Sequence, residues 1–183
     1  MTSAAAQTTR LQIPHGTTLL MVEDEAWVRQ ALRRMLELEG ISVIEAVDGD
    51  DAIRVIERDE AQLLDIVLTD LRMPVVSGSE LIAVVLECRP ALPILAMSAA
   101  VDLPPNLRTV PFLRKPFSPD ELVRAVAPLV LSSQAVRRLS QQADAADSRS
   151  MAEGHRLTAR TQMAQNGDLR LALQQLREKL SRH

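Results

Sequence analysis

Aromatic residues are scarce in this sequence: Trp27, Phe112 and Phe117 are the only three among 183 residues, and tyrosine is absent. With so few rings, the chain lacks the aromatic platform on which proteins stack successive nucleic-acid bases. Its core must be built from Leu, Ile, Val, Ala and Met. A hydrophobic content of 46% is typical of a soluble globular protein and excludes a disordered or fibrous one.

Cysteine and long apolar runs are also lacking. The single cysteine, Cys88, excludes a disulfide within the chain, and its apolar surroundings predict a buried structural thiol. No apolar run approaches the about 20 residues that span a bilayer, and residues 1–16 lack the apolar segment of a signal peptide. We therefore expect a cytoplasmic protein that does not bind membranes, with a flexible leader over residues 1–16.

The net charge of −3 conceals an uneven distribution. Residues 131–183 hold nine basic and five acidic side chains, which gives +4, and the remaining residues therefore carry −7. Two interpretations of this basic tail stay open: a solvated helical tail, or a surface for self-association or for an acidic partner.

Short apolar runs alternate with amphipathic segments from Thr18 onward. This rhythm predicts five βα units and an α/β fold with a doubly wound, mostly parallel sheet. Helical spacing of apolar residues, as in Leu81, Ile82, Val85 and Leu86, marks the crossover helices. The predicted strands are residues 18–22, 42–46, 65–69, 93–97 and 110–113.

Start signals precede two of the predicted helices. Ser77 with Glu80 fits a capping box, and Ser118 is followed by a proline at the first helical position and by Glu121 at the third. The fourth unit is unusual, because Pro104 and Pro105 interrupt the segment after residues 93–97. We expect its helix to be short or absent.

Polar side chains end the predicted strands. Glu23 and Asp24 follow the first strand, Asp70 the third, Ser98 the fourth and Lys115 the fifth. In an open parallel sheet these ends share one edge, where ligands bind. Three carboxylates gathered there would repel one another unless a hard divalent cation, naturally Mg²⁺, lay between them. The set suits phosphoryl transfer, with Asp70 as nucleophile and Lys115 and Ser98 contacting phosphoryl oxygens. Taken singly, each residue could instead be a helix cap, a turn residue or, for Phe112, part of the core.

Taken together, the motifs resemble the two-component receiver domain, which is CheY-like. They are VEDE at 22–25, TDLRMP at 69–74, Gly78, MSA at 97–99 and KPF at 115–117, and they span roughly residues 18–130. The resemblance implies strand order 2-1-3-4-5 with a C-terminal helical extension, Asp70 as phosphoacceptor, and Ser98 with Phe112 as a switch pair. It also implies Mg²⁺ held by Asp24, Asp70 and the carbonyl of Arg72, with Glu23 acting through water.

The resemblance further implies a sensor histidine kinase or a histidine phosphotransfer protein as phosphodonor, and a regulator rather than an enzyme. Two departures stand out. The Ser98–Lys115 interval is shorter than in typical receivers, and Arg72 and Ala100 lie where side chains tune the lifetime of the phosphoryl group. Two alternatives remain: a scaffold that works without phosphorylation, and an aspartyl-phosphate phosphatase, against which Arg72 argues because that class places a second acid there.

The expected domains are a leader at 1–16, a receiver at 17–131 and a helical tail at 132–183. We predict no DNA binding, because the tail shows no helix-turn-helix pattern. Apolar stripes in the tail predict helices that either pair two chains or fold back on the receiver. His155, which lies between the stripes, could be a phosphorelay histidine or a solvated side chain. The stripes are Val136, Leu139, Ala143 and Ala146, then Leu169, Leu173, Leu176 and Leu180.

Overall fold

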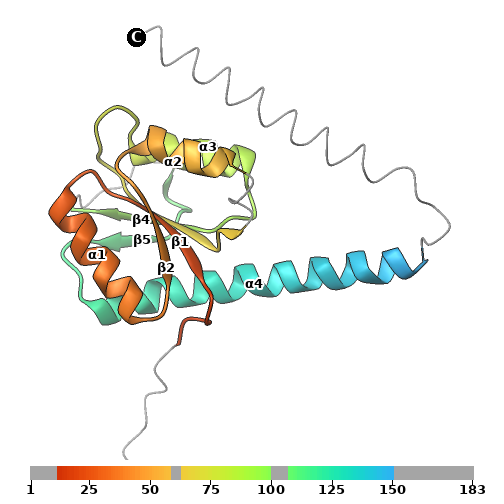
Figure 1. Cartoon of the computed structure of the whole chain (residues 1–183). Helices are drawn as coiled ribbons and strands as arrows, with labels where there is room; N and C mark the ends of the chain where they lie inside the picture. Colours follow the sequence, from red (N-terminus) through yellow and green to blue (C-terminus); the bar gives the residue numbers. More distant parts are fainter. Residues whose placement is uncertain (1–11, 59–62, 100–106, 151–183) are drawn as a thin grey trace, which may run out of the picture.

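The computed structural model describes residues 12–58, 63–99 and 107–150, except for the side chains of residues 142–150 (Figure 1). The leader up to residue 11, Ala100, His155 and the Leu169–Leu180 stripe lie outside the described residues. Strands and helices alternate in the order β1 (Thr18–Val22), α1 (Ala26–Leu38), β2 (Ser42–Ala46), α2 (Gly49–Glu57), β3 (Ile66–Asp70), α3 (Gly78–Cys88), β4 (Ile94–Ser98), β5 (Phe112–Arg114) and α4 (Pro119–Ser150).

The five strands form one parallel sheet in the order β2-β1-β3-β4-β5. The predicted fold class and strand order are confirmed. β1 and β2 have the predicted limits, whereas β3 and β4 begin and end one residue later, so that Asp70 and Ser98 are themselves the last residues of their strands. The last strand is Phe112–Arg114 rather than 110–113.

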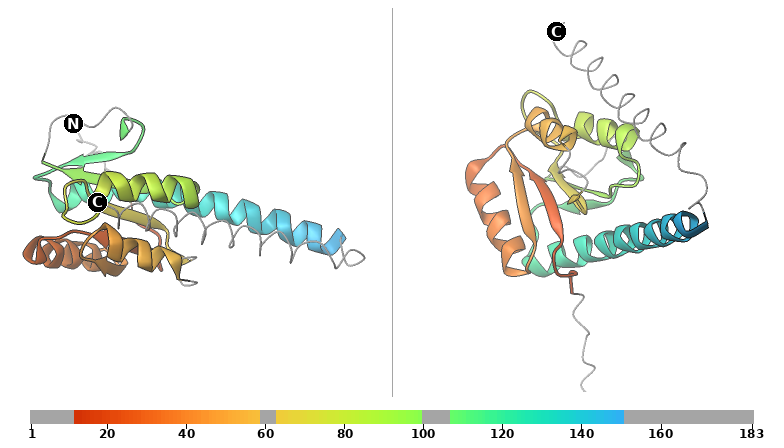
Figure 2. Two further views of the ribbon diagram at one scale, coloured as in Figure 1. Left: turned by 90° about the horizontal axis from the view of Figure 1, so that it is seen from above. Right: turned by 45° about the vertical axis from the view of Figure 1, so that its right-hand side comes forward.

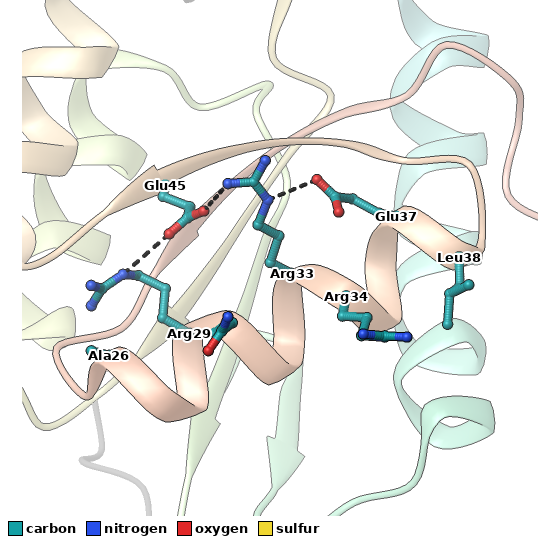
Figure 3. Close-up of a pocket in the computed structure, with 8 residues that line it drawn as sticks. Ala26, Arg29, Arg33, Arg34, Glu37, Leu38 and Glu45 are labelled. Atoms are coloured by element: carbon teal, nitrogen blue, oxygen red, sulfur yellow. Dashed lines mark hydrogen bonds and ion pairs between the residues drawn. The ribbon is translucent and has the colours of Figure 1, made fainter.

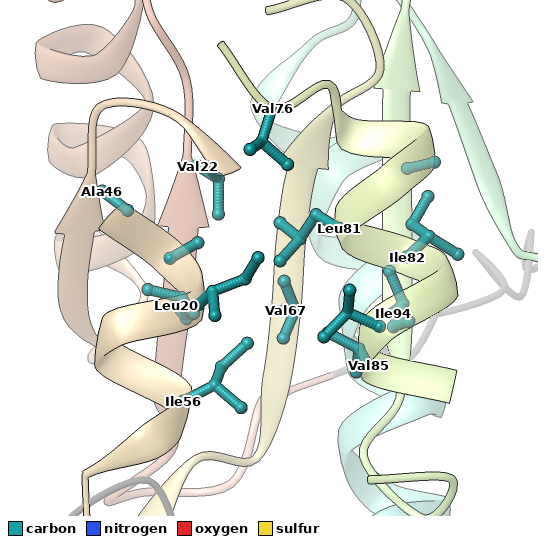
Figure 4. Packing of buried hydrophobic residues seen from close by; sticks show 14 of the residues in the cluster. Leu20, Val22, Ala46, Ile56, Val67, Val76, Leu81, Ile82, Val85 and Ile94 are labelled. Atoms are coloured by element: carbon teal, nitrogen blue, oxygen red, sulfur yellow. The ribbon is translucent and has the colours of Figure 1, made fainter. Parts of the chain in front are cut away.

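Alternate strand residues point into two separate cores. Leu20, Val22 and Val67 face α2 and α3, where they pack against side chains such as Leu81 and Ile56 (Figure 4). Leu19, Met21, Ile66 and Leu68 face the other layer, formed by α1 and α4. Both faces of β1 and β3 are thus covered, which explains why these strands are almost wholly apolar. The rigid sheet fixes the positions of the residues at its carboxyl edge.

Helix starts follow the capping signals in the sequence. Ser77 and Glu80 form the complete capping box of α3. At the start of α4 the Glu121 carboxylate accepts from the Ser118 amide at 2.8 Å, and the Glu121 amide donates to Ser118 Oγ at 3.3 Å. Between β4 and β5 the described residues contain a single turn beginning at Leu107 and no α-helix, while residues 100–106 lie outside the description.

Helix α4 is the longest element, with 32 residues, and it projects beyond the sheet (Figures 1 and 2). The expected boundary at 131/132 falls inside it. Past that boundary, Arg137 donates to the carbonyl of Leu64 at 2.6 Å and pairs with the Asp65 carboxylate at 3.0 Å. Asp65 also accepts from the amide of Thr18 at 2.9 Å, so it ties α4 to the amino edge of the sheet. No helix in the described segments is long and apolar enough to cross a membrane.

Candidate functional site

The carboxyl ends of the parallel strands bring the predicted site residues to one edge of the sheet. Glu23 and Asp24 follow β1, Asp70 ends β3, Ser98 ends β4, and Lys115 follows β5 directly. Because β1, β3, β4 and β5 are consecutive neighbours, residues far apart in sequence converge here.

The Lys115 ammonium joins two of the carboxylates. Its Nζ donates to Glu23 Oε2 at 2.7 Å and also to Asp70 Oδ2. The Glu23 side chain is 1% exposed and that of Asp70 is 13% exposed, so Glu23 lies deeper in the site and the Asp70 carboxylate lies nearer the solvent. The other oxygen of Asp70 accepts from the Arg72 amide at 2.9 Å.

Burial and charge shift two pKa values here. Burial raises the pKa of Glu23, and the nearby Asp70 charge adds to this, while Lys115 opposes it without cancelling it. Burial alone would lower the pKa of Lys115, but its hydrogen bonds to Asp70 and Glu23 raise it above the ordinary lysine value. Lys115 therefore stays cationic at neutral pH, whereas burial disfavours the ionised form of Glu23.

Asp24 is half-buried in the turn between β1 and α1. Arg29 fixes this turn, since its guanidinium donates to the carbonyls of Glu23 at 2.8 Å and of Asp24 at 3.2 Å. Glu45 on β2 in turn holds Arg29 and Arg33, as Figure 3 shows beside the pocket on α1. The motifs did not indicate Arg29, because its role is to donate to backbone carbonyls.

The two residues predicted as a switch pair lie on the edge of the sheet that β4 and β5 form. Ser98 is 1% exposed, and its carbonyl accepts from the Lys115 amide at 2.9 Å. Phe112 is half-buried and packs against the core beneath α2 and α3. Ser98 and Phe112 therefore lie on adjacent strands, β4 and β5, and are offset by two residues, since Phe112 pairs with Ala96 and Ser98 pairs with Arg114.

The loop after Asp70 contains two constraints that the sequence analysis did not identify. A Cβ on Gly78 would overlap the backbone carbonyl of Asp70, so only glycine lets α3 begin this close to β3. Val75 has φ 68°, a left-handed conformation that strains a β-branched residue, and its side chain is 79% exposed. Gly78, which follows the TDLRMP motif in the sequence, was a signal for the first constraint. Nothing in the sequence signalled the second.

A divalent cation fits the chemistry of this donor set. Glu23, Asp24 and Asp70 carry three negative charges against the single charge of Lys115. Glu23 Oε1 is buried and has no hydrogen-bond partner, which is costly unless something else contacts it. In the described part of the chain, however, no three acidic, His or Cys side chains stand ready as a metal cluster. We infer that Lys115 keeps these carboxylates from forming such a cluster, because its ammonium lies between Glu23 and Asp70.

Comparison with known proteins agrees with this geometry. Residues 19–127, more than half of the chain, match the family described as the response regulator receiver domain. The chain belongs to this family. It is 36% identical over 130 residues to the transcriptional regulatory protein ResD of Bacillus subtilis (strain 168), covering 68% of this chain and 50% of ResD. It is 31% identical over 113 residues to GlrR of Escherichia coli (strain K12), covering 59% of this chain and 25% of GlrR.

Solved receiver domains share the fold. The receiver domain of the hybrid histidine kinase CckA aligns with a TM-score of 0.53 and 29% identity over 62% of this chain and 98% of that one. A receiver domain protein from Clostridium thermocellum aligns with a TM-score of 0.60 and 20% identity over 66% and 98% of the two chains. The match lies in the receiver, and the chain spans a quarter to a half of the curated relatives described above. Receiver domains serve phosphorylation-based signalling and are regulatory rather than classical enzymes.

Proposed function

We propose that this receiver domain accepts a phosphoryl group on Asp70 and thereby switches a protein–protein interaction. The observation that carries the proposal is the contact of the Lys115 ammonium with both Asp70 and the buried Glu23. A partly exposed carboxylate beside a fixed cation is a nucleophile placed where negative charge will accumulate.

The donor is a sensor histidine kinase or a histidine phosphotransfer protein. A carboxylate oxygen of Asp70 forms a bond to phosphorus as the phosphorus–nitrogen bond of the donor breaks. The electron pair of that bond returns to the imidazole nitrogen, which takes up a proton from water. The product is an acyl phosphate on Asp70, and no oxidant or further reactant is needed.

The surrounding residues position and neutralise the transferred group. Lys115 donates to one phosphoryl oxygen, and the hydroxyl of Ser98 is placed at the end of β4 to donate to another. Asp24, Asp70 and the Arg72 carbonyl would hold Mg²⁺, with Glu23 acting through water, and a bound Mg²⁺ would neutralise negative charge on the phosphoryl oxygens. The Ser98 hydroxyl then moves toward the phosphoryl group while the ring of Phe112 turns inward, which alters the surface beside β5.

Intact mass spectrometry tests this proposal. The full chain is incubated with MgCl₂ and acetyl phosphate, and we expect one phosphoryl adduct that EDTA prevents. Asp70→Asn should remove the adduct. Asp50→Asn is the matched control, since Asp50 is a partly exposed carboxylate in the first turn of α2 and pairs with Arg54. Absence of an adduct on the wild-type chain, or an undiminished adduct on Asp70→Asn, would overturn the proposal.

A further inference from the structure

The turn that carries Glu23 and Asp24 is held differently from the other helix starts. Helices α2, α3 and α4 begin with a side chain that caps a backbone amide, whereas Glu25, at the start of α1, makes no such bond with its side chain. Arg29 reaches back to this turn instead, and its Nη1 donates to the carbonyls of Glu23 at 2.8 Å and of Asp24 at 3.2 Å. A side chain outside the acidic site therefore fixes the backbone of the two acids.

Glu45 on β2 holds Arg29 from the other side. Its pairing with Met21 places it on the face of the sheet that α1 covers. Its Oε2 accepts from Arg29 Nε at 3.2 Å, as Figure 3 shows. The Arg29 side chain is 16% exposed, so little water competes for these bonds. A lysine would carry the same charge on a single nitrogen in place of the rigid guanidinium fork, so it could not keep all three contacts.

We propose that Arg29, anchored by Glu45, positions the turn of Glu23 and Asp24 for Mg²⁺ and thereby sets the affinity of the site. This inference rests on the proposed function, in which Asp24 would hold Mg²⁺ and Glu23 would act through water. Mg²⁺ demands a near-ideal arrangement of oxygen ligands, so a small shift of the backbone that carries Asp24 lowers the affinity. Arg29 is a positioning residue, since it donates to backbone carbonyls and to Glu45.

The charge of Arg29 by itself would have the opposite effect on Mg²⁺. A cation beside an acidic site repels a second cation, so removing the charge without disturbing the turn should tighten Mg²⁺ binding. Loss of the positioning contacts should weaken it, as substitutions behind metal ligands do by roughly 10–100-fold. The direction of the change in affinity therefore separates positioning from charge.

Mg²⁺ titrations of the full chain, followed by the NMR shifts of the amides in the turn, are the first test. Arg29→Lys keeps the charge and should raise the dissociation constant for Mg²⁺ about tenfold. Arg33→Lys is the matched control and should leave the constant unchanged, because the Arg33 guanidinium also binds Glu45, at 2.6 Å, but its other bond goes to Glu37. An Arg29→Lys protein that binds Mg²⁺ like wild type, or a wild-type chain that binds no Mg²⁺, would overturn the proposal.

Glu45→Gln tests the anchor and does not require Arg29→Lys to fold. It should weaken Mg²⁺ binding by more than Glu37→Gln does. Glu37 pairs with Arg33 at 2.7 Å, so Glu37→Gln removes the same charge from the same network and leaves Glu45 in contact with Arg29. Equal effects of the two variants would show that charge alone is responsible and would overturn the proposal.

The dependence of phosphorylation on MgCl₂ separates positioning from general damage. With acetyl phosphate as donor, Arg29→Lys should need about ten times more MgCl₂ for half-maximal adduct formation and should reach the wild-type rate at saturation. A lower maximal rate with an unchanged MgCl₂ requirement would contradict the positioning role. If the wild-type chain binds Mg²⁺ but forms no adduct, the proposed phosphoryl transfer is wrong, and the role of Arg29 is decided by the titrations alone.

Discussion

The buried carboxylate of Glu23 destabilises the folded protein, and it lies where the proposed function needs negative charge. Its carboxylate is buried, one oxygen has no hydrogen-bond partner, and its pKa is raised by burial. A glutamate chosen for stability alone would not be placed there. The arrangement suits a site that must attract and hold positive charge beside Asp70.

Glu23→Gln should therefore stabilise the fold in the absence of divalent cations. Since the folded-state pKa of Glu23 lies above the unfolded value of 4.5, the wild-type protein is penalised wherever Glu23 is ionised. We expect the free energy of unfolding to rise by roughly 0.5–2 kcal/mol at pH 8. The gain should shrink as the pH falls through the raised pKa, because the wild-type carboxyl then takes up a proton itself.

Urea unfolding in EDTA at pH 8 and pH 5 measures this effect. Glu25→Gln provides a control at an exposed neighbouring position. The same Glu23 variant should lose the stabilisation that MgCl₂ gives the wild-type chain. A variant that is less stable than wild type at pH 8, or equally stabilised by Mg²⁺, would contradict this account.

At the scale of an element, the backbone of the loop from β3 to α3 has opposite requirements at two positions. Gly78 is needed because the carbonyl of Asp70 occupies the space of a side chain, whereas Val75 adopts a conformation that glycine would adopt without strain. Val75 thus carries a side chain where the backbone conformation disfavours one, only three residues before Gly78, where the backbone leaves no room for a side chain.

Exchanging residue types at these two positions should change stability in opposite directions. Val75→Gly relieves the strain and is expected to stabilise by about 0.5–1 kcal/mol after the entropy cost of glycine. Gly78→Ala forces α3 away from β3 and should destabilise by about 1–3 kcal/mol while slowing phosphorylation of Asp70 by acetyl phosphate. Val47→Gly, in another loop at an exposed valine without positive φ, should only destabilise.

Chemical denaturation and the initial rate of adduct formation measure both effects. The interpretation fails if Val75→Gly behaves like Val47→Gly, or if Gly78→Ala leaves both stability and rate unchanged.

The sequence predicted some of these elements better than others. The strand positions follow from short apolar runs, and the helix starts follow from capping residues that act through local hydrogen bonds. The placement of Asp24, Asp70 and Lys115 at one edge follows from the rule for parallel sheets. The roles of Arg29 and Val75 could not be predicted, since one depends on carbonyl positions and the other on a dihedral angle. The prediction divided α4 because charge and composition change near residue 131, whereas the helix itself continues to Ser150.

At the scale of the whole molecule, Asp65 connects three elements across the amino edge of the sheet. It accepts from the Thr18 amide and pairs with Arg137, and its side chain is 7% exposed. The clamp lies at the edge opposite Asp70. It can therefore direct α4 without touching the phosphoryl chemistry.

Asp65→Asn should loosen α4 without affecting phosphorylation. Asparagine can still accept from Thr18, but Arg137 loses its ionic partner, so we expect a loss of about 1 kcal/mol for this partly exposed pair. Hydrogen exchange should become faster in α4 beyond about residue 134 and stay unchanged in α1, and the acetyl phosphate adduct should form at the wild-type rate. Uniformly faster exchange would show a general loss of stability instead.

The length of α4 has a mechanical consequence. The helix begins four residues after Lys115 and continues for 32 residues, about 48 Å. A tilt of about 5° at its first turn would displace its far end by about 4 Å, as simple leverage on a rod of that length requires. A sub-ångström rearrangement around Asp70 could thus become a movement of several ångströms at the far end of α4, without a hinge in the helix.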